Sequence, residues 1–290
     1  MKKTLYISFL ILLMISLTKN VKADENIFYT NLYNIEMTEQ EYDNLLELGF
    51  DENEIYHMTN DIFMDNKDIE ATLESETIEY YKVTTVTQNG NSTTTTEKIT
   101  EEEYENGSQG PQTRASYDGI VETDYKTMRT NISQLSSVQY RYKVTLTWKN
   151  MPSKRSYDII AIGFEPAKVQ MNSTVLFQQQ YTTSSGSSST SSSCIQKSGS
   201  NGGSAVFKLP TGTMSALSSY MYYNVIKAAD NITVTTMYAG GDYAHATENV
   251  SEANAQRHSV NHAGGIILED AVEDSFDDIL VATASWYGTW

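Results

Sequence analysis

Residues 140–148 read Tyr-Arg-Tyr-Lys-Val-Thr-Leu-Thr-Trp, and this stretch decides the fold. Aromatic or aliphatic side chains at the even positions alternate with basic or threonine side chains at the odd positions. A period of two places successive side chains on opposite faces of a β-strand. The stretch therefore predicts a half-buried strand, with one face on a core and the other turned to water.

Similar segments follow along the chain. Stretches typical of strands recur at 121–132, 138–148, 157–164, 169–181, 205–209, 220–226, 232–238 and 279–287, and no helical pattern of comparable strength separates them. Strands spaced in this way favour two antiparallel sheets. We therefore expect a mainly β protein in which residues 117–290 form an antiparallel β-sandwich.

Ahead of the sandwich, residues 24–75 predict a small helical unit. Thr38 and Glu41 match a capping box, in which hydroxyl and carboxylate satisfy the exposed backbone N–H groups of a helix start. Gly49 suits the left-handed position that follows a helix. Asp51 and Glu54 repeat the capping pattern, so a second helix is expected to follow.

A β-hairpin and a linker are expected between the helical unit and the sandwich. Residues 76–106 hold two runs rich in Thr and Val on either side of Asn89-Gly90, a strong two-residue hairpin signal. Residues 107–116 are rich in Gly, Pro and Ser and predict a linker. Cleavage in this linker would make the N-terminal part a removable pro-segment, which is an alternative to a permanent unit.

Three segments carry a family resemblance. They are Tyr42-x2-Leu45-Leu46-x-Leu48-Gly49-Phe50-x3-Glu54-Ile55-x2-Met58, residues 148–152 (Trp-Lys-Asn-Met-Pro) and residues 241–247 (Gly-Asp-Tyr-Ala-His-Ala-Thr). In these segments the chain resembles uncharacterised secreted proteins of low-GC Gram-positive bacteria. The resemblance implies export from the cell, and it assigns no activity and no catalytic residue.

Residues 1–23 read as a secretory signal peptide. Lys2 and Lys3 form a basic start, an apolar run extends from Leu5 to Leu17, and Ala23 stands at the predicted cleavage site. This run is shorter than the roughly 20 residues that span a bilayer as a helix. We therefore expect a secreted, extracellular protein with no stable membrane anchor after cleavage.

Removal of the signal makes the chain more acidic. The signal holds four lysines and no acid, so the mature chain carries 16 basic and 37 acidic side chains and a formal charge of −21. Nucleic acid and anionic lipid headgroups repel such a chain. We expect no nucleic-acid partner, whereas neutral sugars and cationic ligands stay possible.

Residues 182–204 are almost wholly Ser, Thr and Gly, and they include Cys194, the single cysteine of the chain. One cysteine allows no internal disulfide. This composition buries little apolar surface, so it predicts a long mobile loop between two strands. The alternative is the inserting hairpin of a pore-forming or antibacterial toxin. Such a hairpin needs alternation over about 10 residues, which residues 169–177 show only at their start.

A metal-dependent hydrolase is the other alternative. His258 and His262 are four residues apart and would share one face of a helix over 252–262, with His245 or Asp242 as a third ligand. Histidines near a helix C-terminus are also favoured by the helix dipole, which is a structural explanation for the same pattern. On that explanation no cofactor is expected.

The acidic residues near the C-terminus predict the solvated face of an amphipathic helix rather than a calcium site. They recur in pairs every four residues. The six acids are Glu269, Asp270, Glu273, Asp274, Asp277 and Asp278.

Tyrosine is used unusually often, with 20 Tyr against eight Phe and three Trp. A ring with a hydroxyl suits both strands and recognition surfaces. Tyr220, Tyr222, Tyr223 and Trp286 are candidates for an exposed aromatic platform. Because the sequence carries no catalytic motif that we recognise, it predicts a soluble, non-catalytic extracellular binding protein whose partner is a cell-wall glycan or another protein. Its oligomeric state is left open.

Overall fold

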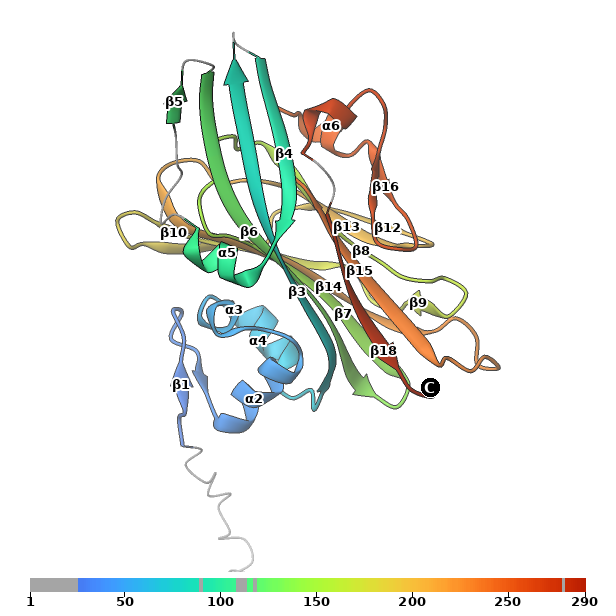
Figure 1. Ribbon diagram of the computed structural model, residues 1–290. Coiled ribbons are helices and arrows are strands. Elements are labelled where there is room, and N and C mark those ends of the chain that lie inside the picture. The colour runs from blue at the N-terminus through green and yellow to red at the C-terminus, as the bar shows by residue number, and fades with distance from the viewer. Residues whose placement is uncertain (1–25, 89–90, 108–113, 117–118, 278–279) are drawn as a thin grey trace, which may run out of the picture.

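The computed structural model describes residues 26–88, 91–107, 114–116, 119–277 and 280–290 (Figure 1). The predicted signal peptide 1–23 with its cleavage site, the predicted turn at Asn89-Gly90 and residues 108–113 of the predicted linker lie outside the described residues. The described chain is mainly β, and the expected antiparallel sandwich, preceded by a helical unit and a hairpin, is confirmed. No helix in the described ranges is long and apolar enough to cross a membrane.

The N-terminal unit combines a short β-ribbon with three helices. Both predicted capping boxes form, one between Thr38 and Glu41 and one between Asp51 and Glu54. Gly49 has the expected left-handed conformation, with φ of 82°, and the chain reverses there. The elements are β1 (Tyr29–Thr30), β2 (Glu36–Met37), α2 (Glu39–Glu47), α3 (Glu52–Tyr56) and α4 (Asn60–Asn66).

The larger sheet of the sandwich has nine strands. Their order is β11-β10-β14-β7-β6-β3-β4, with β5 paired to β6 and β9 paired to β14. The bounds are β3 (Thr72–Gln88), β4 (Asn91–Ile99), β5 (Arg114–Ser116), β6 (Gly119–Ser136), β7 (Gln139–Trp148), β9 (Val169–Met171), β10 (Leu176–Thr183), β11 (Ser188–Ser191) and β14 (Met214–Lys227).

The predicted hairpin is part of this sheet. β3 pairs with β4 on one side, and on the other side it pairs with β6 from Thr72 to Thr87. A short helix, α5 (Glu101–Asn106), follows β4. Arg114–Ser116, inside the predicted linker, pairs with β6 as β5. The hairpin therefore belongs to the sandwich and is not a separate module.

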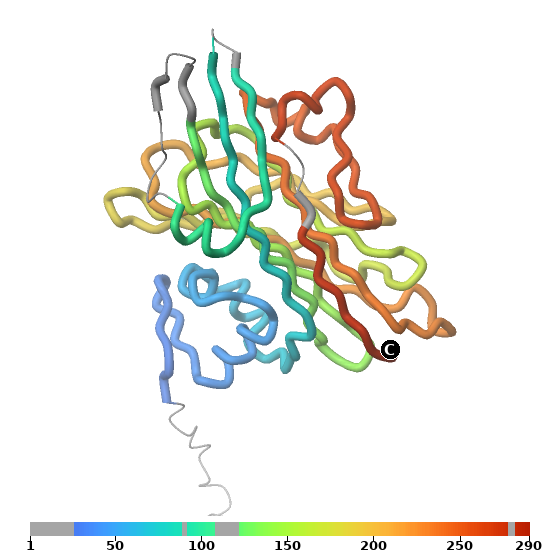
Figure 2. Tube along the Cα trace, viewed as in Figure 1, coloured from blue at the N-terminus to red at the C-terminus, as the bar shows by residue number. Residues whose placement is uncertain are grey.

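The smaller sheet has five strands in the order β12-β13-β8-β15-β18, and its last strand lies beside β3 and β6 (Figure 2). Two short elements, α6 (Glu252–Ala255) and η1 (Glu273–Ser275), and the hairpin of β16 (His258–Val260) with β17 (Ile266–Leu268), complete the fold. The bounds are β8 (Tyr157–Gly163), β12 (Ile195–Gly199), β13 (Gly202–Lys208), β15 (Thr236–Ala244) and β18 (Leu280–Tyr287).

The expectation of a long loop over 182–204 is wrong. The segment contains β11, which pairs with β10, and β12, which pairs with β13. Each adds to the edge of a sheet, where backbone hydrogen bonds hold a strand even when its side chains bury little. Facing hydroxyls add to the pairing, since Thr182 Oγ1 and Ser188 Oγ lie 3.0 Å apart.

The bounds of two other strands differ from the predicted ones. The stretch 169–181 is divided into β9 and β10, because Asn224 N–H donates to the hydroxyl of Ser173 at 2.8 Å where the ladder is interrupted. The strand predicted over 232–238 begins at Thr236 and runs on to Ala244. Strand type was predicted correctly in both places, and the bounds were not.

Strand β7 is buried on both faces, which corrects the expected half-buried strand. Its even-numbered residues pack between the two sheets, as do Ile160 and Ile162 of the smaller sheet. Its odd-numbered residues Arg141, Lys143 and Thr145 face the helical unit and are 3 % exposed or less. The unit therefore covers a mixed surface, in which these polar residues lie beside the rings of Tyr220 and Tyr222.

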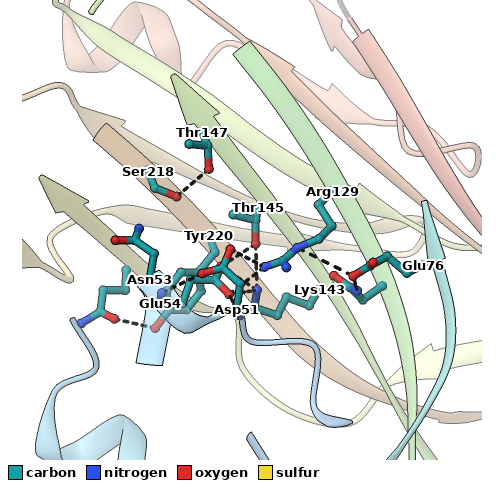
Figure 3. Close-up of polar contacts among 12 residues, drawn as sticks. Asp51, Asn53, Glu54, Glu76, Arg129, Lys143, Thr145, Thr147, Ser218 and Tyr220 are labelled. Carbon is teal, nitrogen blue, oxygen red and sulfur yellow. Dashed lines mark hydrogen bonds and ion pairs between the residues drawn. The ribbon is translucent and has the colours of Figure 1, made fainter. Parts of the chain in front are cut away.

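Glu54 lies at the centre of this contact and is fully buried (Figure 3). Lys143 Nζ lies 2.7 and 2.8 Å from its two carboxylate oxygens. The Thr145 hydroxyl donates to the same carboxylate at 2.6 Å, and Arg129 Nη2 donates at 2.9 Å. One carboxylate on α3 thus binds groups from both β6 and β7.

The cluster is ionised at neutral pH. Burial alone would raise the pKa of Glu54, but the charges of Lys143 and Arg129 outweigh it and hold this pKa below its usual value. Burial also lowers the pKa of Lys143, to about 8, despite the attraction of Glu54. The rings of Phe50 and Tyr220 flank the Lys143 ammonium at 5.1 and 4.9 Å and exclude water from it.

Replacement of Glu54 tests this interaction. Glu54→Gln should lower the free energy of unfolding by about 3–5 kcal/mol, because it leaves the buried Lys143 without its countercharge, whereas Arg129 keeps Asp51 as a partner. Glu52→Gln, an exposed position on the same helix, is the control and should change stability by less than about 0.5 kcal/mol. Urea unfolding of both variants measures the difference, and equal midpoints would contradict the central role of Glu54.

Candidate functional site

Figure 1 shows that β3, β4 and β6 extend past the smaller sheet. A polar cavity of about 290 Å³ lies on the inner face of these three strands. Loops at 153–154 and 245–247 form its other wall. Its ionisable lining groups are Glu122, Asp124, Lys154 and His245. Six hydroxyl side chains also line it: Thr85, Thr87, Ser92, Thr94, Ser153 and Thr247.

Strand register explains why these groups share one face. Thr85 pairs with Thr94 on one side and with Glu122 on the other, so these three form a row across β4, β3 and β6. In the next row Val83 pairs with Asp124. Because side chains two residues apart on a strand point the same way, both rows face the cavity.

His245 lies on the wall of the cavity and is held by Asp158. Its Nδ1 lies 2.9 Å from Asp158 Oδ2, and the other carboxylate oxygen accepts a bond from the backbone N–H of Ala246 at 3.0 Å. Tyr243 also donates its hydroxyl to Asp158. Burial lowers the pKa of His245, but the charge of Asp158 outweighs this and leaves the pKa above its ordinary value.

Asp124 is the second ionisable group of the cavity and is 6 % exposed. Burial raises its pKa to about 7, although the positive charges of His245 and Lys126 oppose the shift and the neighbouring Glu122 assists it. Asp124 is thus partly protonated at neutral pH. It is able both to donate and to accept a hydrogen bond.

Below the cavity, Lys126 and Asp277 form a fully buried pair. Lys126 Nζ lies 2.6 Å from Asp277 Oδ2, and both side chains are 0 % exposed. Asp277 Oδ1 accepts a bond from the backbone N–H of His245 at 2.8 Å. This pair connects the floor of the cavity to the segment that precedes β18.

The arrangement suits a polar ligand and proton transfer to it. Hydroxyl and carboxyl groups donate to and accept from the hydroxyls of a ligand, and the mixed charges favour a neutral ligand over a polyanion. Asp124 has a pKa of about 7, so it can both give and take a proton near neutral pH, which is the property required of a general acid or base. The volume matches a single small ring rather than a long chain.

The four predicted metal ligands do not come together. His245 is bound to Asp158, and Asp242 Oδ2 accepts a backbone N–H from β17 at 2.7 Å. His258 lies in β16, and His262 is exposed in the turn after it. Across the described ranges, no three His, Cys, Asp or Glu side chains form a group able to hold a metal ion. The predicted convergence is therefore wrong.

The helix expected over 252–262 ends at Ala255 because the chain turns back as a β-hairpin. The side chain of Asn261 accepts two backbone N–H groups in that turn, and Gly264 has φ of 99°. His258 Nδ1 donates to the Ala255 carbonyl at 2.8 Å, and its Nε2 lies 2.8 Å from Ser204 Oγ. Burial lowers the pKa of His258 to about 4, so its ring is neutral.

The predicted aromatic platform is not exposed. Tyr220 and Tyr222 are at most 2 % exposed and pack under the helical unit. Tyr223 lies between the sheets, and Trp286 is 8 % exposed with its ring 5.5 Å from that of Tyr140. The tyrosines lie on β14, which is covered from both sides, and Trp286 lies on the covered face of β18; alternation in the sequence does not reveal what covers a strand.

The acids near the C-terminus do not form the expected helix face. Only Glu273–Ser275 is helical, as a single short turn, and Asp277 is buried against Lys126. Asp278 lies outside the described residues. Sequence reasoning missed Asp124, Lys126 and Asp158 altogether, although charged residues at 122, 124 and 126 interrupt what would otherwise be the apolar face of a strand.

No protein-family model matches the chain, and a search of curated proteins finds no significant match. Beside the cavity, the ring of His245 lies 5.0 Å from that of Trp148. Support for a function therefore comes from the cavity and its ionisable groups.

The pairing of His245 with Asp158 is testable by NMR titration. The pKa of His245 should lie above 6.5, and Asp158→Asn should lower it, because burial then acts without the compensating charge. Asp270→Asn, an exposed position, is the control and should leave it unchanged. The stabilisation from this pair is full below the unfolded-state pKa and is lost as pH rises through the folded-state pKa. An unchanged His245 titration in Asp158→Asn would contradict the assignment.

Proposed function

We propose that the protein is exported, loses residues 1–23, and acts outside the cell as a non-catalytic binding protein for a neutral glycan of the cell wall. The basic start, apolar run and small residue at position 23 support export. The cavity bounded by β3, β4 and β6 supports the choice of ligand. A protein partner is the alternative.

The observation that carries the proposal is the density of hydroxyl groups in the cavity. Six Ser and Thr side chains and two carboxyl groups line about 290 Å³. The hydroxyl groups of a sugar both donate and accept hydrogen bonds. The Ser, Thr and carboxyl groups of the cavity wall can serve as partners for both. The formal charge of −21 on the mature chain disfavours anionic polymers as ligands.

Export and processing have a direct readout. When the chain is produced by a Gram-positive host, the protein recovered from the medium should begin at Asp24, because Ala23 precedes the cleavage site. N-terminal sequencing measures this. Recovery only inside the cell, or a first residue within the sandwich, would contradict the proposal.

Binding through the cavity is tested with purified peptidoglycan and with a glycan array. Thr94→Val should weaken retention about five- to tenfold, because it removes one hydrogen-bonding group from the wall while keeping the shape of the side chain. Thr93→Val is the matched control, since its side chain points to the opposite face of β4.

Three outcomes would count against the proposal. Equal retention of the two threonine variants would place the ligand elsewhere on the protein. No retention of the unaltered protein on any glycan would remove the glycan ligand. Release of new reducing ends from peptidoglycan would show turnover, and Asp124, with a pKa of about 7 beside Glu122, would then be the expected general acid.

A further inference from the structure

Lys126 and Asp277 are placed for a reaction with each other. They are 151 residues apart in the chain, yet Nζ and Oδ2 are 2.6 Å apart, and both side chains are 0 % exposed. Lys126 lies on the inner face of β6, and Asp277 immediately precedes the segment that leads into β18. Such a distance places the amine within reach of the carboxyl carbon.

The surroundings hold both groups in a single arrangement. The rings of Trp148 and Tyr243 flank Lys126 Nζ at 5.1 Å each. Asp277 Oδ1 accepts the backbone N–H of His245 at 2.8 Å, and the backbone N–H of Asp277 donates to the His245 carbonyl at 2.8 Å. The carboxyl group cannot rotate away without breaking these bonds.

Both side chains are withdrawn from water, so no solvent competes with the direct contact between amine and carboxyl. Separating charges in a dry site is costly, and transfer of one proton from the ammonium to the carboxylate removes both charges. Two ionisable groups interact electrostatically with the pair, Asp124 on β6 with Lys126 and His245 after β15 with both residues, and His245 is bound in turn by Asp158 on β8. They supply further proton donors and acceptors close to the reacting atoms.

The second buried lysine shows why this pair is distinct. Glu54, the partner of Lys143, also binds Arg129 and the Thr145 hydroxyl, so two cations keep its carboxylate ionised and unreactive. Among the described residues, Lys126 is the one cation within ion-pair distance of Asp277. Asp277 therefore has one lysine in direct contact with its carboxylate, whereas the Glu54 carboxylate is bound by both Lys143 and Arg129.

We propose that Lys126 and Asp277 become joined by an amide bond between Nζ and Cγ. The ammonium gives a proton to the carboxylate, and the lone pair of the neutral amine then attacks Cγ. The C–N bond forms, one C–O bond breaks, and that oxygen leaves as water with two of the three ammonium hydrogens. Nothing is oxidised or reduced, and no co-reactant is needed. Fixed proximity supplies the rate that free amines and acids lack.

The amide bond would cross-link this chain in the way that a disulfide cross-links other proteins. With Cys194 as its single cysteine, the chain forms no internal disulfide. An amide between β6 and the residue that leads into β18 would close a loop of about 150 residues and restrict the unfolded chain. Unlike a disulfide, it would resist reducing agents.

Intact mass spectrometry of the purified mature protein tests whether the amide bond forms. The unaltered protein should weigh less than its sequence by one water molecule, and a protease digest should contain a branched peptide that joins the residues around Lys126 and Asp277. Lys126→Arg keeps the positive charge beside Asp277 but removes the reactive amine, so it should have its full sequence mass. Lys143→Arg, at the other buried ion pair, is the matched control and should still lack one water.

Two results would overturn the proposal. One is a full sequence mass for the unaltered protein, which needs no variant to interpret. The other is the loss of one water in Lys126→Arg as well, because the loss would then come from another site. If Lys126→Arg does not fold, the branched peptide of the unaltered protein remains a sufficient test. Neither result depends on glycan binding, which is measured separately.

Discussion

The buried carboxylate of Glu54 is the interaction on which the arrangement of the sandwich depends. Strand β7 lies in the middle of the larger sheet, and its outer face carries Arg141, Lys143 and Thr145. Without a countercharge this face would have to stay in water, and the helical unit could not lie on it. Glu54 supplies that charge from the first turn of α3, where its second role as a capping residue already fixes its position. The helix cap and the sheet contact thus share one side chain.

The same logic holds on the other side of the larger sheet. β6 directs Arg129 and Asn131 toward the helical unit and directs Asp124 and Lys126 toward the smaller sheet. Of these four residues only Arg129 is partly exposed, so the sheet carries an ionic cluster on each face, and the two are neutralised by segments distant in sequence. A strand of this kind has only one register in which its charges meet partners, because a slip of one residue would exchange its two faces.

The sequence correctly predicted which residues lie on the same face of a strand or helix. It did not predict which part of the chain packs against that face. The alternation at 140–148, both capping boxes and the left-handed Gly49 depend on local geometry, and all are confirmed. The exposure expected for Tyr220 and Tyr222, and the solvated helix expected around Asp277, depended on contacts with residues more than 100 positions away. Local periodicity carries no information on such contacts. For the same reason the pairing of His245 with Asp158 could not be read from the chain.

The cavity follows from a difference in strand length. β3 has 17 residues and β8 has seven, which correspond to about 55 and 23 Å at roughly 3.3 Å per residue. Two sheets of such different length cannot cover each other completely, so the larger sheet continues past the smaller one. On β3, the side chains of the inner face change from the core residue Val83 to Thr85 and Thr87 at the point where the smaller sheet no longer covers the strand. The site is thus the continuation of the core surface beyond its covering sheet.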